Sequence, residues 1–475
     1  MRSIACKLAL AAAIVTGLSV PAVAAASTPV ELGVKYLEKV QKSESTTGVP
    51  TFGGDWALTS LAAGGRAAAD VHRGMGSVYD REWYESYINS PAWLEETVKF
   101  ANPATEYEKA VLVAYAAGID PSRLSIGRNL LAGLLSEYQY ATMTMPVGYF
   151  GLLPSRLEGT IFAVLAFADT TTSTGAKPIP AVLLKQSVEV IEKNEHTDGG
   201  WNYNKVEGEA KGLESKSEPD TTGAAMAALC TSGIKNTAEE EAVAKGKAYL
   251  KSILEKSGAF KYIEGINADS NAWAVSGLNM CGINASELKK EEAKAESPVK
   301  FLETLQIKSG ENEGGFLYKP SGTLNNYSSQ DAVRALAGAG FTAAPPVPTK
   351  RTEAEPKAPA QWSFAETFSS EESSQLALII NNGSSLKVCS VSVKAAEGKP
   401  TSLLLLKVLE AAKAGTGVKP SGCVSAFLPE SGSGAITSVN GTAGTWKVSF
   451  DGGATETTAE LGTQVKLGAV IYLNG

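Results

Sequence analysis

The chain has 475 residues, of which 44% are hydrophobic and 20% charged, and it carries a formal net charge of -7. An acidic surface makes nucleic acid and anionic lipid poor partners, so no nucleic-acid ligand is expected. This length suits about two or three domains with sizeable cores, since a single core rarely grows beyond a few hundred residues.

The N-terminus has the three parts of a secretory signal peptide. Arg2 and Lys7 precede an apolar run over residues 8–20, and residues 21–26 offer an Ala-x-Ala cleavage site. We therefore predict a signal peptide over residues 1–26 and a secreted, extracellular protein. No other apolar run approaches the roughly 20 residues that span a bilayer, so no membrane span is expected after processing.

Six alanine- and glycine-rich apolar segments follow at intervals of about fifty to sixty residues, a period typical of helical arrays. They cover residues 55–64, 107–118, 158–168, 220–230, 269–279 and 329–338. Helices that are apolar on nearly all sides must be buried, whereas the intervening segments 178–192 and 238–254 are amphipathic. The pattern predicts a mainly α fold, an α6/α6 toroid over residues 27–342 with six inner and six outer helices.

The composition changes after the last repeat. Residues 343–360 are rich in proline and polar residues, which predicts a linker. Beyond it, residues 376–380 and 386–393 are expected strands around the hairpin turn at 381–383, followed by a helix over 402–413 and strands over 436–439, 445–450 and 470–473. Residues 361–475 are therefore predicted to form a small α+β domain.

Four cysteines remain after signal removal, an even number for an oxidising compartment. Cys230 and Cys281 end neighbouring inner helices at nearly equivalent positions, and Cys389 and Cys423 both follow the linker. We expect two disulfides, one in each domain; four buried free thiols are the alternative.

The turn Asp198-Gly-Gly-Trp201 resembles the repeats of the prenyltransferase and squalene-cyclase superfamily. Within it, residues 219–230 and the C-terminal stretch 435–446 are similar to segments of the cobalamin carriers, intrinsic factor and the transcobalamins. The resemblance implies an α/α toroid followed by a transcobalamin-like domain. It also implies cobalamin or another corrinoid as the small-molecule ligand, and a cell-surface receptor or transporter as a partner.

Two catalytic alternatives share the toroid. A class II terpene cyclase would need an Asp-x-Asp-Asp acid, and the nearest approach, Asp269-Ser-Asn271, lacks the second carboxylate that raises one pKa. Protein prenyltransferases need a zinc site, but His72 and His196 are expected to be loop residues, and no metal site is identified. The chain is therefore expected not to be an enzyme.

The parallel inner helices should bring their N-terminal ends to one opening of the ring. Acidic residues there are either helix caps or a binding surface for amides and phosphates, and the aromatic residues beside them either pack the repeats or contact a ligand. The predicted ligand-binding residues are Asp55, Trp56, Tyr107, Glu158, Tyr203, Asp220, Thr221, Asp269, Asn271, Trp273, Tyr318 and Gln330, with Trp446 from the C-terminal domain.

The leading hypothesis is a secreted, non-catalytic protein that holds a corrinoid or another bulky amphipathic ligand between the toroid and a C-terminal domain folded over the opening. Asp220→Ala should then weaken binding more than it lowers stability. The alternatives are a terpene or squalene cyclase-like enzyme that acts on an isoprenoid inside the ring, and a structural module of the cell exterior.

Overall fold

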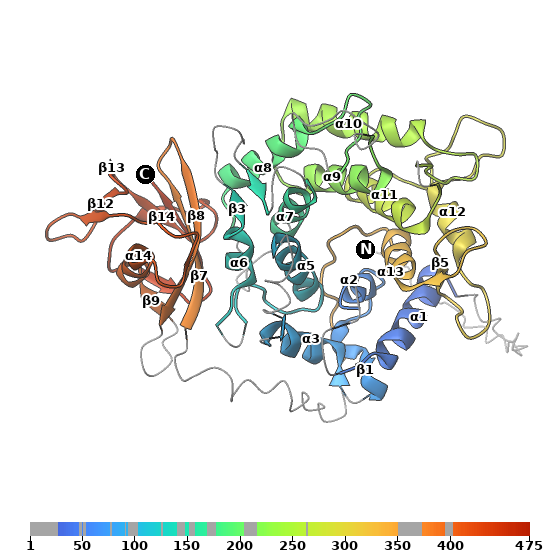
Figure 1. Cartoon of the computed structure of the whole chain (residues 1–475), viewed down its shortest axis with the longest axis horizontal. Helices are drawn as coiled ribbons and strands as arrows, with labels where there is room; N and C mark the ends of the chain where they lie inside the picture. The colour runs from blue at the N-terminus through green and yellow to red at the C-terminus, as the bar shows by residue number, and fades with distance from the viewer. Residues whose placement is uncertain are drawn as a thin grey trace, which may run out of the picture.

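The helical and the β-rich parts of the chain follow one another in the computed structural model (Figure 1). The structure describes residues 27–46, 50, 54–76, 78–90, 92–93, 103–124, 127–139, 148–151, 157–168, 177–203, 216–262, 265–349, 373–394 and 402–475. The predicted signal peptide lies outside these residues. No described helix is both long and apolar enough to cross a membrane.

Six helices pack side by side in a closed circle, each on the next and the last on the first (Figure 1). They are α2 (Ala57–Ala63), α5 (Pro103–Ala116), α7 (Glu158–Ala168), α9 (Pro219–Thr231), α11 (Ala268–Met280) and α13 (Asn326–Leu336). Each covers one of the apolar segments in which the sequence predicts an inner helix. The toroidal arrangement of helices is therefore confirmed.

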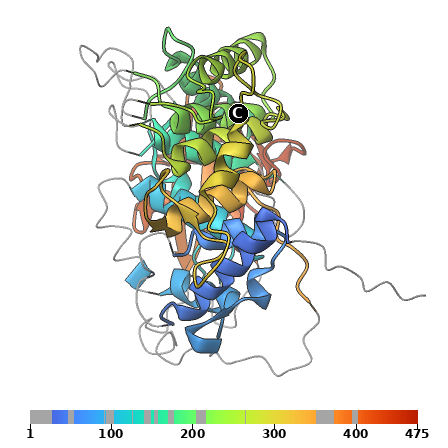
Figure 2. The ribbon, with the colours of Figure 1, turned by 90° about the vertical axis from the view of Figure 1, so that its right-hand side faces the viewer.

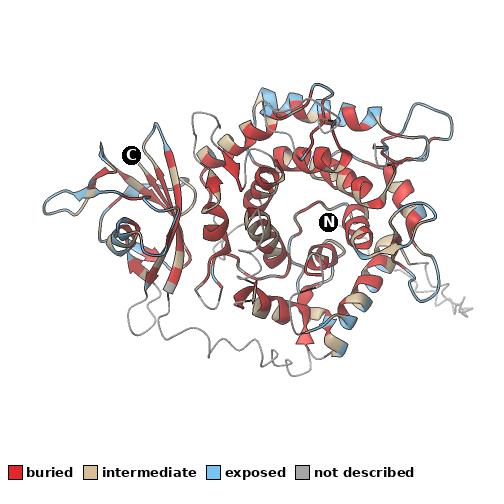
Figure 3. Ribbon diagram, viewed as in Figure 1, coloured by how far each residue is buried: buried red, intermediate tan, exposed pale blue. Residues whose placement is uncertain are grey.

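A second layer of helices surrounds this circle and alternates with it along the chain. It contains α1 (Pro29–Ser43), α3 (Asp80–Asn89), α6 (Leu130–Leu135), α8 (Ala181–Lys193), α10 (Thr237–Ser252) and α12 (Pro298–Leu305). Figure 3 shows the inner helices buried almost all round, while α10 and α1 expose their outward faces. The difference follows the sequence, since α1 and α10 carry many charged residues whereas the inner helices are mostly apolar.

Short elements connect these helices. They are the 3₁₀ turns η1 (Ala68–Asp70) and η2 (Gly74–Gly76), and the two-residue strand pairs β1 (His72–Arg73) with β2 (Val78–Tyr79), β3 (Tyr138–Gln139) with β4 (Tyr149–Phe150), and β5 (Phe316–Leu317) with β6 (Leu324–Asn325).

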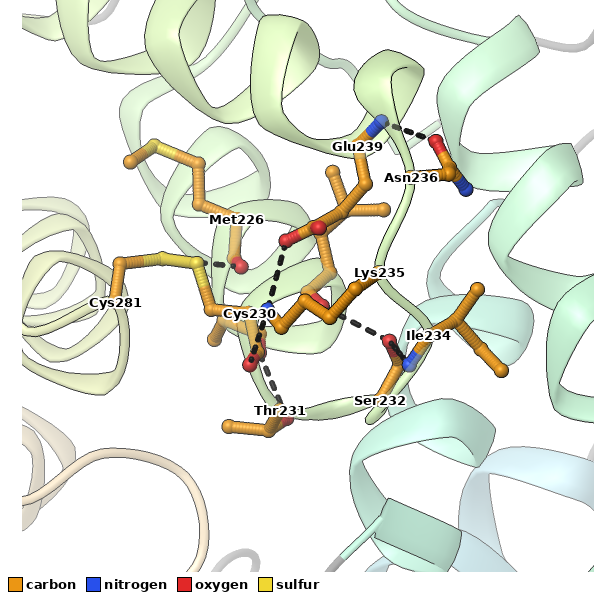
Figure 4. Close-up of polar contacts among 11 residues, drawn as sticks. Met226, Cys230, Thr231, Ser232, Ile234, Lys235, Asn236, Glu239 and Cys281 are labelled. Atoms are coloured by element: carbon orange, nitrogen blue, oxygen red, sulfur yellow. Dashed lines mark hydrogen bonds and ion pairs between the residues drawn. A yellow bond between two sulfur atoms is a disulfide. The ribbon is translucent and has the colours of Figure 1, made fainter. Parts of the chain in front are cut away.

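Helices α9 and α11 approach closely because small residues face each other. A Cβ atom added to Gly277 would lie 2.1 Å from the carbonyl oxygen of Gly223, so no larger residue fits there. The disulfide between Cys230 and Cys281 joins the same two helices at their C-terminal ends (Figure 4). The second predicted disulfide, between Cys389 and Cys423, also forms. Both expected pairings are confirmed.

The chain turns outward beside the first disulfide, as Figure 4 shows. Lys235 Nζ lies 3.5 Å from the carbonyl oxygen of Cys230 and 3.2 Å from Glu239 Oε1. The side chain of Asn236 then caps α10 by accepting a hydrogen bond from the Glu239 amide at 2.8 Å. These contacts fix the end of an inner helix to the start of the next outer one.

Residues 340–349, which we call the strap, continue from α13 across the ring of inner helices (Figure 1). Ala343 packs against Ala62 and Ala116, at the C-terminal ends of α2 and α5. Thr349 then donates from its amide and its hydroxyl to Asp70 Oδ2, at 2.8 and 2.6 Å. The described start of the predicted linker is therefore held against the ring.

The C-terminal part is built on a six-stranded sheet of order β10-β8-β7-β17-β14-β15, in which only β7 and β17 are parallel. Its strands are β7 (Ser373–Asn381), β8 (Leu386–Lys394), β10 (Val418–Lys419), β14 (Lys447–Ser449), β15 (Thr457–Thr458) and β17 (Val470–Asn474). Helix α14 (Leu405–Ala414) packs beside it. Smaller pairings join β9 (Ser402–Leu404) to β16 (Gln464–Lys466), and β11 (Phe427–Pro429) to β12 (Ile436–Val439) and β13 (Thr442–Ala443).

Both faces of this sheet are covered. Along β7, Leu376 and Leu378 belong to the core shared with α14, whereas Ala377 and Ile379 belong to a core shared with the ring. The sheet packs on α6, at the outer side of the ring, and the view in Figure 2 places it behind the helices. Asn129 fixes this contact, because its side-chain amide donates to the carbonyl oxygen of Gly468 at 2.9 Å.

The expectation that the C-terminal domain folds over the opening of the ring is therefore wrong, and so is the role expected for Trp446. Its side chain is 0% exposed, lies in the core of the C-terminal domain and donates from Nε1 to the carbonyl oxygen of Thr442. A residue enclosed in that core cannot contact a ligand held by the inner helices.

Candidate functional site

The first turns of the inner helices lie next to one another, and we call this end of the ring the N-terminal rim. Ser270 of α11 donates to Asp220 of α9 at 3.4 Å, and Ser328 of α13 donates to Asp269 of α11 at 2.6 Å. The expected gathering of these helix ends is present in the described part of the chain.

A carboxylate at the rim is followed one turn deeper by an aromatic residue on two of these helices. Glu158 and Phe162 have this spacing on α7, as do Asp269 and Trp273 on α11. Residues four apart lie on the same face of a helix. The acids and the aromatic side chains therefore form two successive layers along the axis of the toroid.

Asp269 is the rim acid with the clearest potential for chemistry. Burial, together with the negative charge of Asp331 on α13, raises its pKa to about 7. Ser328 donates to its Oδ1 atom, which fixes the orientation of the carboxyl group. With a pKa of about 7, a substantial fraction of Asp269 carries a proton near pH 7, and because it is half-buried its carboxyl group still reaches the rim.

Asp331 is the second carboxylate that the sequence around Asp269 lacks. Its Oδ2 atom accepts a hydrogen bond from Trp273 Nε1 at 2.9 Å, and its Oδ1 atom pairs with Arg334 one turn further along α13. Burial raises the pKa of Asp331, while Arg334 lowers it. Both oxygens accept from donors, so Asp331 suits the ionised state and leaves Asp269 to hold the proton.

Aromatic rings surround this pair. Phe162, Trp273 and Phe341 meet edge to face, with ring centroids 5.1 to 5.5 Å apart. The Arg334 guanidinium lies 5.2 Å from the ring of Trp56 and 5.6 Å from that of Phe341. The rings of Trp56 and Phe341 therefore flank the buried cation of Arg334, an interaction that the π faces of aromatic rings favour.

Further carboxyl groups line the rim. Burial, together with the charge of Asp220, raises the pKa of Glu218 to about 7. Glu108, on α5, is 1% exposed, and burial together with Glu158 raises its pKa well above the usual range. Lys109 lies 3.5 Å from Asp55 and balances part of this charge.

The interpretation of the rim acids as helix caps is wrong for three of them. Trp56 occupies the cap position of α2, so Asp55 lies before it, and α9 begins after Glu218, so Asp220 lies inside the first turn. Helix α11 is capped by Asn267, which leaves the carboxyl group of Asp269 free for other contacts. The three acids are therefore not explained by helix capping alone.

Several predicted ligand-binding residues serve the packing of the repeats instead. The ring of Tyr107 packs on Gly133 of the outer helix α6 and on Trp93, so it faces away from the rim. Asn271 is fully buried, and its side chain bonds to the backbone of Phe260 and Asn267. For Tyr107 and Asn271, the structure contradicts a role in binding at the rim.

The remaining predicted residues contribute less to the site. Thr221 donates to Glu218 at 2.9 Å, and Gln330 is buried with its Oε1 atom unpaired among the described residues. The carbonyl oxygens of Tyr203 and Tyr318 accept hydrogen bonds from the backbone at the starts of α7 and α11. These two tyrosines thus connect consecutive repeats.

No group of three potential metal ligands occurs among the residues that the structure describes. His72 stacks on Tyr79, with ring centroids 4.4 Å apart, and the amide of His196 donates to the carbonyl oxygen of Gly200 within its turn. Both histidines therefore have local contacts, but the expected loop position is wrong for His72, which lies in the two-residue strand β1.

The protein should be more stable in mild acid than in mild alkali. Burial raises the pKa values of Asp269, Glu218 and Asp80 to about 7, whereas in the unfolded chain they should lie near 4. Between these values the folded state binds more protons, so stability falls as pH rises from ~4 to ~7. We expect a melting temperature several degrees higher at pH 5 than at pH 8. Glu218→Gln should flatten this slope; a melting temperature that rises over the same range would contradict the prediction.

The comparisons with known proteins give distant structural matches. A type II terpene cyclase from Scytonema is 12% identical, with a TM-score of 0.38 over 65% of this chain and 96% of the cyclase. An unsaturated glucuronyl hydrolase from a Bacillus species is 11% identical, with a TM-score of 0.37 over 65% of this chain and 95% of that enzyme. A possible member of the GH105 family from Salmonella enterica is 10% identical, with a TM-score of 0.41 over 66% and 94%. No family model and no curated protein matches the chain.

Proposed function

We propose that the helical part is a complete α6/α6 toroid and that it is an enzyme, in which Asp269 protonates a largely uncharged, isoprenoid-type substrate at the N-terminal rim. The observation that carries the proposal is the pairing of Asp269 with Asp331 beside a cluster of aromatic rings. This was the alternative hypothesis from the sequence, and the pairing removes the main objection to it.

The two carboxyl groups have complementary roles in this proposal. Asp331 is held in the ionised form by Arg334 and by the indole of Trp273. Burial of Asp269, reinforced by the negative charge of Asp331, raises the pKa of Asp269 to about 7. A general acid is most effective when its pKa lies near the working pH, which is the condition that this pair meets.

The aromatic rings favour a hydrocarbon substrate. Phe162 and Trp273 are half-buried and lie one turn below the acids, with their rings in contact. Their faces bind apolar groups and stabilise a positive charge that develops there. A carbon–carbon double bond that is protonated near Asp269 would form such a charge.

The proposed reaction leaves the elemental composition of the substrate unchanged, because one proton is gained and another is lost. The O–H bond of Asp269 breaks as its proton forms a new C–H bond with one alkene carbon, and the other carbon becomes a cation. A second double bond attacks that cation and closes a ring. Loss of a proton from a neighbouring carbon to water ends the reaction, and solvent returns a proton to Asp269. The product is an isomer of the substrate.

Incubation in deuterated water tests this mechanism directly. The full chain would be incubated with geranylgeraniol, squalene and oxidosqualene, and products would be analysed by mass spectrometry. Because the proton on Asp269 exchanges with solvent, each cyclic product should carry one deuterium at the carbon that was protonated. Cyclic products without deuterium would contradict Asp269 as the proton donor, and no product from any of these probes would contradict the isoprenoid substrate.

The same preparation distinguishes the enzyme from the non-catalytic carrier. Calorimetry with cobalamin tests the corrinoid hypothesis, whose expected binding site between two domains is removed by the lateral contact of the sheet with α6. Tight corrinoid binding together with inert isoprenoids would favour a carrier over the function that we propose.

A further inference from the structure

We infer that the strap is an autoinhibitory plug, in which Phe341 fills the aromatic layer of the ring and must withdraw before an apolar ligand can bind there. The inference rests on the proposed function, because that ligand is the proposed substrate of the acid pair. Phe341 is 0% exposed and belongs to none of the six inner helices, yet its ring meets those of Phe162 and Trp273, with centroids 5.5 and 5.1 Å away. The closed form therefore has a side chain of the strap where the substrate would lie.

Phe341 makes the contacts that a bound hydrocarbon would make. It meets Phe162 and Trp273 edge to face, a geometry that aromatic pairs favour. Its ring centroid lies 5.6 Å from the guanidinium of Arg334, which pairs with Asp331. Withdrawal of Phe341 would therefore uncover surface of two aromatic rings beside the acid pair, and a ligand in its place would contact that surface.

The start of the strap has the features of a hinge. Gly338 and Gly340 separate the end of α13 from Phe341, and Gly338 has a φ of 73°, in the left-handed region. Glycines give the backbone the conformational freedom that a hinge requires. The amide of Phe341 donates to Met280 Sδ at 3.2 Å, and a thioether is a weak acceptor. Rotation at Gly340 therefore costs the amide of Phe341 only a weak hydrogen bond.

The rest of the strap lies mostly on the surface. Ala343 packs on the C-terminal ends of α2 and α5, but residues 344–349 are largely exposed and form no helix or strand. Their three prolines have no N–H group for a backbone hydrogen bond. Thr349 then donates to Asp70 from its amide and its hydroxyl. A segment with so little buried surface opens at a smaller free-energy cost than the core helices.

Chymotrypsin tests the inference on the full chain, because it cleaves after phenylalanine and reaches Phe341 only when the strap has withdrawn. We expect saturating farnesol or geranylgeraniol to speed cleavage after Phe341 by at least about tenfold. Burial of one phenylalanine favours the closed form by roughly this factor or more, and the ligand removes that preference. Mass spectrometry would identify the fragments. Slower or unchanged cleavage with both alcohols would overturn the inference.

Cleavage after Phe316 is the internal control, because Phe316 is equally buried but lies in β5. The alcohols should leave its rate unchanged; faster cleavage at both sites would mean that they unfold the ring, and would also overturn the inference. Asp70→Ala is the matched variant, since it removes the acceptor of Thr349. It should speed cleavage after Phe341 severalfold without ligand and leave cleavage after Phe316 unchanged. Equal rates after Phe341 in Asp70→Ala and the wild type would refute the plug.

The result for the strap is distinguishable from the result for the enzyme. Faster cleavage after Phe341 without any cyclic product from these alcohols would retain the plug and refute the proposed reaction. Cyclic products together with unchanged cleavage would retain the enzyme and refute the plug.

Discussion

Replacement of Asp269 by asparagine should reduce product formation by about 10³-fold, the usual contribution of a general acid. Asparagine has nearly the same shape and can still accept the hydrogen bond from Ser328, so the rim should keep its structure. It cannot deliver a proton. The loss should therefore appear in the turnover number and leave the affinity for substrate within a few-fold of the wild type.

Asp220→Asn is the control for this experiment, because Asp220 occupies the same position in the first turn of the neighbouring helix α9. Its contacts are with the amide of Thr221 and the hydroxyl of Ser270. It should lose less than about tenfold, since its charge contributes to the raised pKa of Asp269 but Asp269 is the proposed proton donor. Equal losses in both variants would show that rim charge, and not proton transfer, is what matters.

Removal of the Asp331 carboxylate should cost more stability than removal of any surface charge. Arg334 is fully buried, and its guanidinium depends on Asp331 and on Thr59 for polar contacts. Asp331→Ala leaves this cation without its counter-ion and should lower the free energy of unfolding by about 3–5 kcal/mol. Urea denaturation of the two proteins at pH 7 measures the difference.

The double variant Asp331→Leu with Arg334→Met provides the internal check. It replaces both charges by apolar groups, and such replacements often restore most of the stability that a single change removes. Lys251→Ala breaks the exposed pair with Glu291 and should leave the stability nearly unchanged. A double variant as unstable as Asp331→Ala would refute the charge argument and indicate that side-chain packing at these positions dominates.

The toroid was predictable because the apolar composition of each repeat by itself predicts a buried helix. The segment 220–230, for example, has no polar face, so it must lie inside, and Gly223 opposite Gly277 shows the cost of any larger residue. The equivalent positions of Cys230 and Cys281 in two such segments then predict their disulfide. Local periodicity is sufficient for features of this kind.

The acid pair could not be read in the same way. Asp269 and Asp331 belong to different repeats. A search for two carboxylates within one short motif, such as Asp-x-Asp-Asp, therefore does not detect them. One signal was present: Asp331 follows Tyr327 by four residues and precedes Arg334 by three, so all three share a face of α13. Only the closure of the ring turns that face toward Asp269.

The position of the C-terminal domain was also missed, although β7 carried the relevant pattern. Residues 376–380 are a continuous apolar run, and a strand that is apolar on both faces must be covered on both. One face meets α14 and the other meets the ring at α6. The apolar run thus indicated that a second structural element covers the other face of the sheet. The expected position of the domain over the opening did not take this into account.

The contact between α1 and α13 has a consequence for how this chain acquires its structure. Tyr36 donates to Asn326 at 2.7 Å, and Gln306 reaches the carbonyl oxygen of Pro29, so the circle closes between segments at opposite ends of the helical part. Helix α1 can therefore pack on α13 only after nearly the whole helical part has been synthesised. Pairing over such long sequence separations slows folding and leaves apolar helix faces exposed meanwhile. We therefore expect the incomplete ring to be prone to aggregation during synthesis, until α13 has formed and packed on α1.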